Sequence, residues 1–379
     1  MRKRGRKVKA DQESFSHLAI ASSSGPGVDV RSVRRVLVTR LRFLGDIVLT
    51  TPLLAILKKA NPALRIAYLL EDTYAPILFH HPHVDEIWPL RRRAGSLRGE
   101  VGQILALRRR AQSFRPEVGI DLLGLPRSAF LLYLTGAPVR IGGNYRVRKH
   151  LYTHVVRHRE PQLSAIDYHL ENLSPLGIKG PFAEEDLRTR LDVLPEEVAR
   201  IRGRFRIEGG QLMVGLHPGA TWPAKRWFPE RFAELARQLQ SRLGARVVLT
   251  TGPGEEELVS RVAAAAQGAA ESLPVLDLRG LAALLSLLDA YVANDCGPMH
   301  VAAALGTPTI GLFGPGEPNI WFPYRREDGH VALHHPCPLH PCHRDFCEDL
   351  TCFRQLEVDE VFKAVTWAIE QRRSVRATD

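Results

Sequence analysis

The strongest chemical pattern in this chain is the run from Asn294 to His300, NDCGPMH, which continues directly from an apolar segment. Residues 291–295 predict a buried strand, Gly297-Pro298 a tight turn into a short helix, and residues 309–313 the next buried strand. Such a unit aims unpaired backbone N–H groups and a helix dipole past the end of the strand. An ordinary crossover would explain the apolar runs, but not the polar residues around the turn. The pattern therefore predicts an anion-binding loop containing Asp295, Gly297, Pro298, Met299 and His300.

A second group of polar residues follows two other predicted strands, at 212–219 and 245–252. Lys225 and Arg226 lie between two tryptophans and two prolines, which favours a diphosphate-binding pair over ordinary surface charge. Thr250 ends the neighbouring strand, where it could meet a nucleoside. With His217 and Gly219 at the first strand end, these residues predict that the second half of the chain binds a nucleoside diphosphate.

In the first half, Gly45-Asp46 stands where a predicted strand, 35–41, turns into a helix over about 47–60 with Pro52 as a kink. A helix N-terminus favours an ionised carboxylate, and an ionised Asp46 facing a cleft could accept a proton from a hydroxyl group. Simple N-capping of the helix is an equally good explanation from spacing alone.

Four of the five cysteines, Cys337, Cys342, Cys347 and Cys352, are separated by equal intervals and interspersed with histidines. Three explanations compete: a structural zinc or iron–sulfur site, reduced cysteines that pack an irregular loop, and disulfides. The uniform spacing differs from the paired short spacing of familiar zinc sites. Disulfides are the least favoured, because the N-terminus lacks the apolar segment of a secretory signal.

The net charge of +11 is unevenly distributed. Residues 1–180 hold 30 Lys and Arg against 14 Asp and Glu, a charge of +16, whereas the remainder has a charge of −5. This asymmetry predicts an anionic partner for the first half. A solvated helix face explains any single arginine, but the cluster as a whole favours a surface for anionic lipid or glycolipid. The cluster includes Arg91, Arg92, Arg93, Arg108, Arg109 and Arg110.

The 379 residues suit two domains, and the alternation of apolar strands with helices predicts an α/β fold with two doubly wound parallel sheets. We expect a basic disordered tail at 1–33, a first domain at 34–180, a linker at 181–210, a second domain at 211–356 with a Cys-rich loop at 336–353, and a closing helix at 357–379. Further strands are predicted at 65–71, 139–143 and 274–280, and a short helix near 195–203 in the linker. Ligands bind at the carboxyl ends of parallel strands, which predicts an active-site cleft between the domains.

Several familiar motifs are absent from the sequence. There is no G-x-G-x-x-G after the first strand of either half, no Walker A sequence, no H-E-x-x-H and no G-x-S-x-G, which counts against nicotinamide enzymes, NTPases, metalloproteases and serine hydrolases. No run of the sequence approaches the length of a membrane span.

Three segments of the chain resemble glycosyltransferase family 9, whose best-known members are the ADP-heptose:lipopolysaccharide heptosyltransferases. The segments are RLRFLGDIVLTTPLLAILK, HPGATWPAKRWFPERFAELARQL and NDCGPMHVAAALGTPTIGLFGP, in family order and at family spacing. The resemblance implies a GT-B architecture, two Rossmann-like domains with the active site between them. It also implies inversion, no catalytic cofactor or divalent metal, and heptose transfer from ADP-heptose to the inner core of lipopolysaccharide (Kdo-lipid A or heptosyl-Kdo-lipid A).

The resemblance also implies residue roles and partners. Asp46 matches the general base, Lys225 the lysine that meets the donor phosphates, and Asp295 to His300 the D-x-G-x-x-H donor loop, with Cys296 where many members have Ser or Thr. The expected partners are an ADP-sugar donor, an anionic glycolipid acceptor and the cytoplasmic face of the inner membrane, without nucleic acid. Two alternatives stay open: a family-9-like transferase with another nucleotide sugar and glycan acceptor, and a non-catalytic protein that binds anionic lipid or nucleic acid on a GT-B scaffold.

Overall fold

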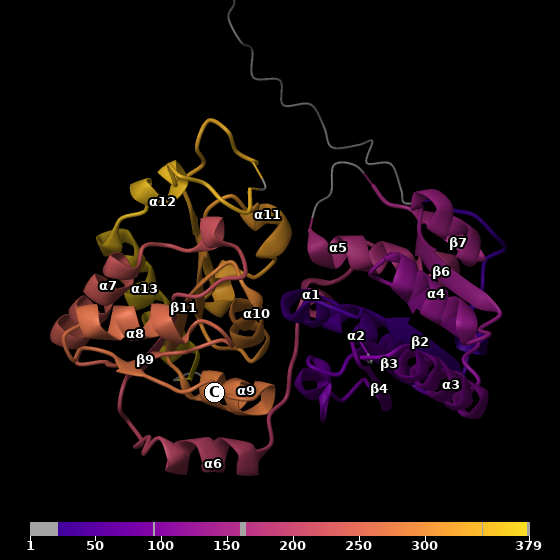
Figure 1. Ribbon diagram of the computed structural model, residues 1–379, viewed down its shortest axis with the longest axis horizontal. Helices are drawn as coiled ribbons and strands as arrows, with labels where there is room; N and C mark the ends of the chain where they lie inside the picture. Colours follow the sequence, from indigo (N-terminus) through magenta and orange to yellow (C-terminus); the bar gives the residue numbers. More distant parts are fainter. Residues whose placement is uncertain (1–21, 94, 160–163, 343, 377–379) are drawn as a thin grey trace, which may run out of the picture.

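The computed structural model describes residues 22–93, 95–159, 164–342 and 344–376. The chain folds into two α/β halves that lie side by side, the N-terminal half in indigo and magenta and the C-terminal half in orange and yellow (Figure 1). Each half has a mainly parallel sheet covered by helices, which confirms the predicted fold class.

The N-terminal sheet has, within the described residues, seven strands, of which β1 alone is antiparallel to its neighbour. Its strand order is β1 (Ser22–Ser23), β7 (His154–Arg157), β6 (Val139–Gly143), β5 (Val118–Asp121), β2 (Arg35–Thr39), β3 (Arg65–Glu71) and β4 (Glu86–Leu90). The helices of this half are η1 (Val30–Ser32), α1 (Leu44–Leu49), α2 (Thr51–Ala60), η2 (Ala75–Leu78), α3 (Leu97–Phe114), α4 (Pro126–Leu134), η3 (Arg146–Leu151), α5 (Ala165–Leu170) and η4 (Glu171–Leu176).

The C-terminal sheet is parallel throughout its described strands. Its order is β10 (Glu271–Ser272), β9 (Arg246–Leu249), β8 (Met213–His217), β11 (Ala290–Asn294), β12 (Thr309–Phe313) and β13 (Val331–His334). Its helices are η6 (Pro223–Lys225), α7 (Pro229–Leu243), α8 (Glu256–Ala265), α9 (Leu278–Leu287), α10 (Gly297–Ala304), α11 (Pro318–Trp321), η7 (Arg326–Asp328), α12 (Thr351–Gln355) and α13 (Val358–Arg376).

Local sequence explains the elements that carry the C-terminal half. Every residue of β11 is buried, as expected of a central parallel strand with helices on both faces. Helix α7 buries Phe232, Leu235, Ala236 and Leu239, which recur at helical spacing on one face. It ends at Gly244, whose φ of 64° is the left-handed conformation that glycine adopts without strain. None of the helices in the described part of the chain has the length and apolar character that a membrane span needs.

The predicted disordered tail is too long. Residues 22–33 are folded: Ser22 and Ser23 pair with β7, and the apolar side chains of Val30 and Val33 are buried in the core of the N-terminal half. Asp29 caps η1 by accepting a hydrogen bond from the Arg31 backbone N–H at 2.9 Å. The rest of the predicted tail, residues 1–21, lies outside the described residues.

Two predicted elements differ from the structure. The predicted strand at 274–280 does not form; Asp277 instead accepts a hydrogen bond from the Gly280 N–H at 2.6 Å and caps helix α9. The predicted single helix over 47–60 is two helices, α1 and α2, which meet at Thr50. Pro52 has no N–H to donate, so it is tolerated in the first turn of α2.

The predicted linker contains η5 (Glu184–Leu187) and α6 (Pro195–Arg204), the expected short helix. Helix α6 packs on α9, so the later part of the predicted linker is attached to the C-terminal half. Arg279 of α9 fastens this junction: its guanidinium pairs with Glu197 and donates to the backbone oxygens of Asp192 and Phe79, at 3.0 and 3.2 Å. Because Phe79 belongs to the N-terminal half, this one side chain holds both halves and the linker together.

Candidate active site

Asp46 lies beyond the carboxyl end of β2, an interior strand of the N-terminal sheet, as the third residue of α1. Its Oδ1 is 2.5 Å from a guanidinium nitrogen of Arg40, and its Oδ2 accepts a hydrogen bond from the Phe43 N–H at 3.2 Å. These two contacts fix the orientation of the carboxylate and leave each oxygen with capacity for a further hydrogen bond. Asp46 therefore caps its helix, and its side chain is still 14% exposed.

Helix α1 packs directly against α10 of the other half (Figure 1). The approach is so close that a Cβ atom on Gly45 would lie 2.4 Å from Cδ2 of His300. A Cβ atom on Gly297 would lie 2.9 Å from Cβ of Leu44. The predicted donor loop and the turn that carries Asp46 thus meet through two positions where only glycine leaves enough space.

His300 is buried in this contact. Its Nδ1 lies 2.7 Å from the hydroxyl of Tyr324, a residue outside the predicted loop. Burial lowers the pKa of His300 to about 4, Asp46 acts in the opposite direction, and Lys225 lowers the pKa further. The imidazole is therefore neutral at physiological pH. Asp46 and Lys225 belong to different halves of the molecule, and the charges of both affect the pKa of this one histidine.

Lys225 forms an ion pair with Asp295, the carboxylate at the start of the donor loop. Its ammonium group also lies 4.8 Å from the centre of the Trp222 ring, a cation–π contact. The sequence placed these residues in two separate motifs, and the structure brings them together at the end of β11. Both side chains are largely buried, which concentrates opposite charges beside the N-terminus of α10.

Asn294, which the sequence reasoning did not single out as a site residue, joins the donor loop to the segment that carries Lys225. Its Oδ1 accepts a hydrogen bond from the Trp227 N–H at 3.0 Å, and its Nδ2 donates to the backbone oxygens of Pro218 and Gly219 at 2.9 and 3.2 Å. The side chain is fully buried. One amide thereby fixes both ends of the segment that carries Lys225 relative to β11.

Arg226 does not share the position of Lys225. Its guanidinium turns back on its own loop, where Nε and a terminal nitrogen both donate to the backbone oxygen of Ala220, at 2.9 and 2.8 Å. These bonds stabilise the turn that precedes Lys225. In this arrangement the predicted phosphate-binding pair consists of one ammonium group, which is paired with Asp295, and one loop-stabilising guanidinium.

His217, Thr250 and Gly219 form a buried polar network around Glu255, a residue that the sequence reasoning missed. His217 Nδ1 lies 3.0 Å from Thr250 Oγ1, and its Nε2 is 3.4 Å from Glu255. Burial lowers the pKa of His217, and the Glu255 carboxylate opposes that effect. A Cβ atom on Gly219 would lie 2.1 Å from the same carboxylate. The network positions the strand ends, and Thr250 uses its hydroxyl within the protein.

Met299 and Pro298 contribute to the donor loop through packing. Met299 is fully buried, with its sulfur next to Gly311 of β12. Pro298 stands in the first turn of α10, where its missing N–H removes no helical hydrogen bond. Burial raises the pKa of the Cys296 thiol at the N-cap, so the thiol stays protonated. Substitution of the more usual Ser or Thr by Cys296 is consistent with a loop that acts through its backbone N–H groups.

The predicted arginine cluster separates into two parts. Arg108, Arg109 and Arg110 lie on α3, whereas Arg91, Arg92 and Arg93 follow β4. The charge of Arg92, together with those of Arg42 and Arg127, affects the pKa of Glu71 at the end of β3. Burial raises the pKa of Glu71, and these three guanidinium groups oppose the shift. The second part therefore adds positive charge at the strand ends near Asp46. The charges of Asp46, Arg42 and Arg92 all affect the pKa of Tyr74, which places them in the same neighbourhood.

The four regularly spaced cysteines come together. Cys337, Cys342, Cys347 and Cys352 are free thiols that line one pocket of about 240 Å³. Ala224, which directly precedes Lys225, also lines this pocket and donates its N–H to the Asp345 backbone oxygen at 3.1 Å. Among the described residues, which exclude His343, no three His, Cys, Asp or Glu side chains are grouped so that they could hold a metal ion. The structural metal site stays a prediction, which elemental analysis tests.

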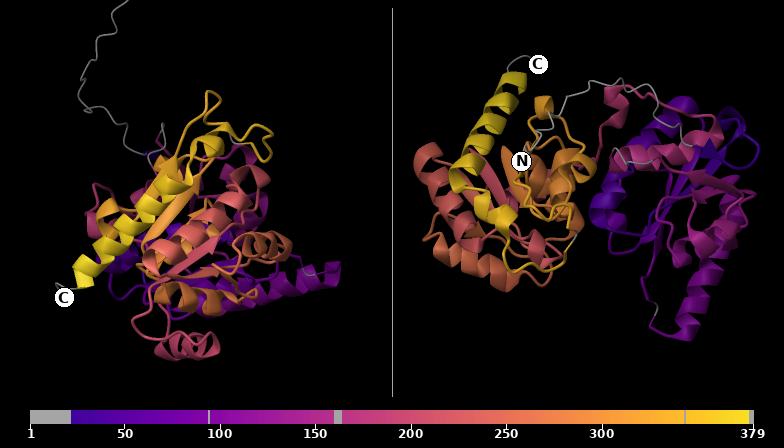
Figure 2. Two further views of the ribbon diagram at one scale, coloured as in Figure 1. Left: turned by 90° about the vertical axis from the view of Figure 1, so that its left-hand side faces the viewer. Right: turned by 90° about the horizontal axis from the view of Figure 1, so that it is seen from above.

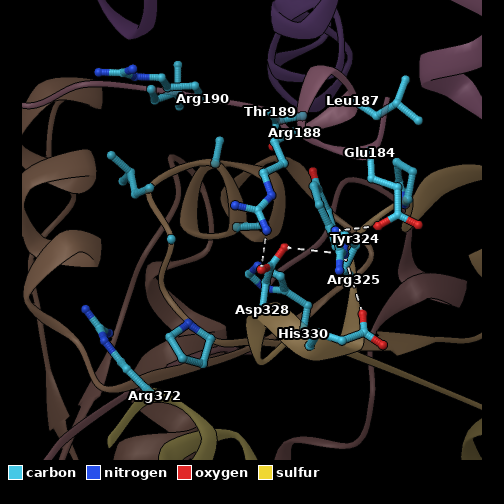
Figure 3. Close-up of a pocket in the computed structure, with 18 of the residues that line it drawn as sticks. Glu184, Leu187, Arg188, Thr189, Arg190, Tyr324, Arg325, Asp328, His330 and Arg372 are labelled. Atoms are coloured by element: carbon cyan, nitrogen blue, oxygen red, sulfur yellow. Dashed lines mark hydrogen bonds and ion pairs between the residues drawn. The ribbon is translucent and has the colours of Figure 1, made fainter. Parts of the chain in front are cut away.

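A cavity of about 930 Å³ lies behind the donor loop, between the linker and the C-terminal half. Figure 3 shows Tyr324 in this cavity beside Thr189 of the linker. Ion pairs of Arg188 with Asp328 and of Arg325 with Glu184, at 2.9 and 2.6 Å, attach the linker to this wall. On the other side, Lys59 of α2 pairs with Asp186 at 2.7 Å. The linker is thereby tied to both halves, and Tyr324 connects it with His300.

Comparisons with known proteins found relatives that match most of the chain. Lipopolysaccharide heptosyltransferase 1 from Pseudomonas aeruginosa is 32% identical over 329 residues, which cover 83% of this chain and 87% of that protein. Lipopolysaccharide heptosyltransferase 3 from Escherichia coli is 29% identical over 296 residues, 75% of this chain and 84% of that protein. Among solved structures, ADP-heptose lipopolysaccharide heptosyltransferase II from E. coli has a TM-score of 0.74 at 24% identity and covers 89% of this chain and 99% of its own.

A family 9 glycosyl transferase from Veillonella parvula has a similar fold, with a TM-score of 0.77 at 23% identity over 91% of this chain and 99% of its own. These structural matches support the GT-B architecture. The sequence profile of glycosyltransferase family 9 (heptosyltransferase) matches residues 104–348. The chain is therefore a glycosyltransferase enzyme and belongs to glycosyltransferase family 9.

Proposed function

We propose that this glycosyltransferase transfers heptose from ADP-heptose to the inner core of lipopolysaccharide, with inversion and without a divalent metal ion. The observation that carries the proposal is the meeting of α1 with α10, where Asp46 and Lys225 both act on His300. A carboxylate from one half and a cation from the other thus face a single position. The lipopolysaccharide heptosyltransferases among its relatives support the choice of sugar and acceptor.

The donor diphosphate would bind beside the N-terminus of α10. This helix of eight residues begins at Gly297, so the positive end of its dipole and the first-turn N–H groups, which have no partner within the helix, lie at this position. Lys225 adds an ammonium group next to this end, and its partner Asp295 holds it there in the absence of donor. When the diphosphate binds, Lys225 would exchange part of its contact with Asp295 for a charge-assisted hydrogen bond to phosphate. A solved relative, an E. coli heptosyltransferase with ADP-2-deoxy-2-fluoro heptose, supports an ADP-sugar as donor.

In the transfer step, the acceptor hydroxyl attacks the anomeric carbon as the bond from that carbon to the diphosphate oxygen breaks on the opposite face. Asp46 accepts the hydroxyl proton, and ADP leaves with the bonding electrons. Lys225 and the N–H groups of α10 stabilise the negative charge that grows on the diphosphate. The contacts of Asp46 with Arg40 and the Phe43 N–H support this role, because they fix its orientation before the acceptor arrives.

The acceptor would be an anionic glycolipid, Kdo-lipid A or heptosyl-Kdo-lipid A, at the cytoplasmic face of the inner membrane. Arg42, Arg92 and Arg127 support this proposal, since all three act on Glu71 at the strand ends of the N-terminal half. Carboxylate or phosphate groups of the acceptor would bind near these guanidinium groups. The positive charge of this half, +16 over residues 1–180, favours the same class of acceptor.

The decisive experiment measures the mass of the acceptor after incubation with the purified enzyme. ADP-heptose is supplied with Kdo-lipid A and, separately, with heptosyl-Kdo-lipid A, and we expect a one-heptose increment on one of them. Parallel reactions replace ADP-heptose by other ADP-, UDP- and GDP-sugars. An increment only with another sugar would support the alternative donor, and no increment with any donor would favour a non-catalytic binding protein.

A further inference from the structure

Helix α3 exposes an apolar stripe that no contact within the described protein covers. The helix buries Leu107, Ala111 and Phe114 towards the sheet, where the Phe114 and Trp88 rings lie 5.5 Å apart. On the other face Leu97, Val101 and Leu105 are 82%, 48% and 49% exposed. Their spacing of four residues aligns them along one side of the helix. A continuous row of exposed apolar side chains on one side of a helix, unlike a single one, indicates an interaction surface.

The same face of α3 is positively charged. Arg98, Arg108 and Arg109 are all exposed and lie around the apolar stripe. Glu100 is the one acidic residue in the helix, and it pairs with Arg127 of α4 at 3.6 Å. Leucine and valine between arginines, with the single carboxylate of Glu100 paired to Arg127, is the composition of a helix that lies in the interface of an anionic membrane. Nucleic acid would use the arginines but would leave the apolar side chains in water.

The position of α3 suits that partner. The N-terminal end of the helix projects from the N-terminal half in both views of Figure 2. Helix α3 follows β4 as a crossover, so its first turn lies at the carboxyl edge of the sheet, the edge that also carries Asp46. Arg127 confirms this placement: besides Glu100, it bonds the Arg91 backbone oxygen at 2.8 Å. The stripe is thus on the side of the domain from which a membrane-held acceptor would reach Asp46.

We propose that the N-terminal half of α3 inserts Leu97, Val101 and Leu105 into the interface of an anionic bilayer, with Arg98, Arg108 and Arg109 on the lipid headgroups. This inference deepens the proposed function, since it explains how a soluble fold meets a glycolipid acceptor. It needs no particular sugar or acceptor, because the contact is with bulk anionic lipid. The basic surface predicted from the sequence therefore includes apolar side chains, which would set how deeply the helix lies in the bilayer and how the protein is oriented on it.

Vesicle sedimentation tests the proposal with the full-length protein. Vesicles of phosphatidylethanolamine and phosphatidylglycerol without glycolipid are compared with phosphatidylcholine vesicles. We expect wild-type protein to bind the anionic vesicles and L97S/V101S/L105S to bind about 100-fold more weakly. The control is Val275→Ser, a substitution at an exposed valine of the C-terminal half, which should bind like wild type. Thermal unfolding checks that all three proteins are folded, and we expect a slightly lower midpoint for L97S/V101S/L105S because serine has a lower helix propensity than leucine.

Two further arms separate membrane docking from catalysis. In R98Q/R108Q/R109Q we expect weaker binding that depends less steeply on salt than that of wild type. With a deacylated, water-soluble acceptor, L97S/V101S/L105S should transfer sugar at the wild-type rate. Equal vesicle binding by wild type and L97S/V101S/L105S would overturn the inference, as would absence of binding by wild type or a preference for an oligonucleotide over vesicles. Absence of transfer in every arm, with vesicle binding still dependent on the stripe, would overturn the proposed function alone.

Discussion

The hydroxyl of Tyr324 lies 2.7 Å from Nδ1 of His300, which ties the donor loop to the wall of the linker cavity. Burial raises the pKa of Tyr324, and a hydrogen bond with the Thr189 side chain opposes this shift. The phenol is therefore neutral and connects the linker on one side with the donor loop on the other. Since His300 also touches the turn that carries Asp46, the orientation of its ring affects both halves of the site.

Replacement of Tyr324 by Phe should loosen that orientation. Loss of the hydroxyl leaves Nδ1 of the buried His300 without its partner, which costs about 1–3 kcal/mol of unfolding free energy. We expect a lower kcat with little change in the KM for the donor, because the substitution leaves Lys225, the proposed phosphate ligand, in place. Urea unfolding and initial-rate kinetics measure the two effects. Tyr133→Phe, at an exposed tyrosine of α4, is the matched control and should change neither.

Asp46→Asn should abolish most of the transfer and leave ADP binding intact. The amide can keep the hydrogen bond from the Phe43 N–H but cannot accept the acceptor proton, and general-base catalysis contributes about 10²- to 10⁴-fold. Single-turnover rates with saturating donor measure the loss, and calorimetric titration with ADP measures binding. If Asp46→Asn kept most of its activity, the base would have to be another residue.

Lys225→Met should weaken the donor step through both charge and structure. The variant loses the cation beside α10 and leaves the buried Asp295 carboxylate unpaired. We expect kcat/KM for the donor to fall about 100-fold. Lys363→Met serves as the control, because Lys363 is exposed on α13 and its ion pair with Asp359 is at the surface. The double variant Lys225→Met/Asp295→Asn should recover unfolding free energy but not transfer, which distinguishes a lost phosphate contact from simple destabilisation.

The donor loop was predictable from sequence because its determinants are local. An apolar strand, Gly297-Pro298 and an apolar helix occur in one uninterrupted stretch, and the structure has β11 and α10 there. Strands β3 and β6 were predicted with their observed bounds for the same reason. Strands β1 and β13 were not, since edge strands of two and four residues carry little periodic signal.

The site was predictable in its residue types but not in its pairings. The ion pair of Lys225 with Asp295 joins residues 70 positions apart, and no local pattern indicates such a contact. The same holds for Asn294 and Tyr324, whose roles arise from the loops that pack against them. For Arg226 the prediction from charge was a phosphate ligand, but its guanidinium donates to the nearby Ala220 carbonyl oxygen instead. Local patterns therefore indicate where the site is, whereas the contact that each side chain makes depends on the tertiary structure.

Acid should destabilise the fold at a pH where its surface carboxylates are still ionised. Burial lowers the pKa values of His81, His300 and His330 to about 4, below the usual value of 6.5. Between pH 6.5 and 4 the unfolded chain binds protons at these positions that the native state does not, so unfolding free energy falls as pH falls. Urea unfolding at steps from pH 7 to 5 should show this slope. His330→Gln, outside the donor loop, should reduce it by about one proton.

Gly45→Ala tests the contact between the halves with the smallest possible change. One methyl group at this position would lie 2.4 Å from the His300 ring, so α1 and α10 must separate or the imidazole must turn away from Tyr324. We expect a loss of about 1–3 kcal/mol in unfolding free energy and a fall in transfer of at least tenfold. Gly102→Ala, in α3 with no atom within 4 Å of its added methyl, should instead gain up to about 1 kcal/mol from helix propensity. Full activity in Gly45→Ala would mean that the two halves need not touch here during transfer, and that Asp46 reaches the acceptor from a more open arrangement.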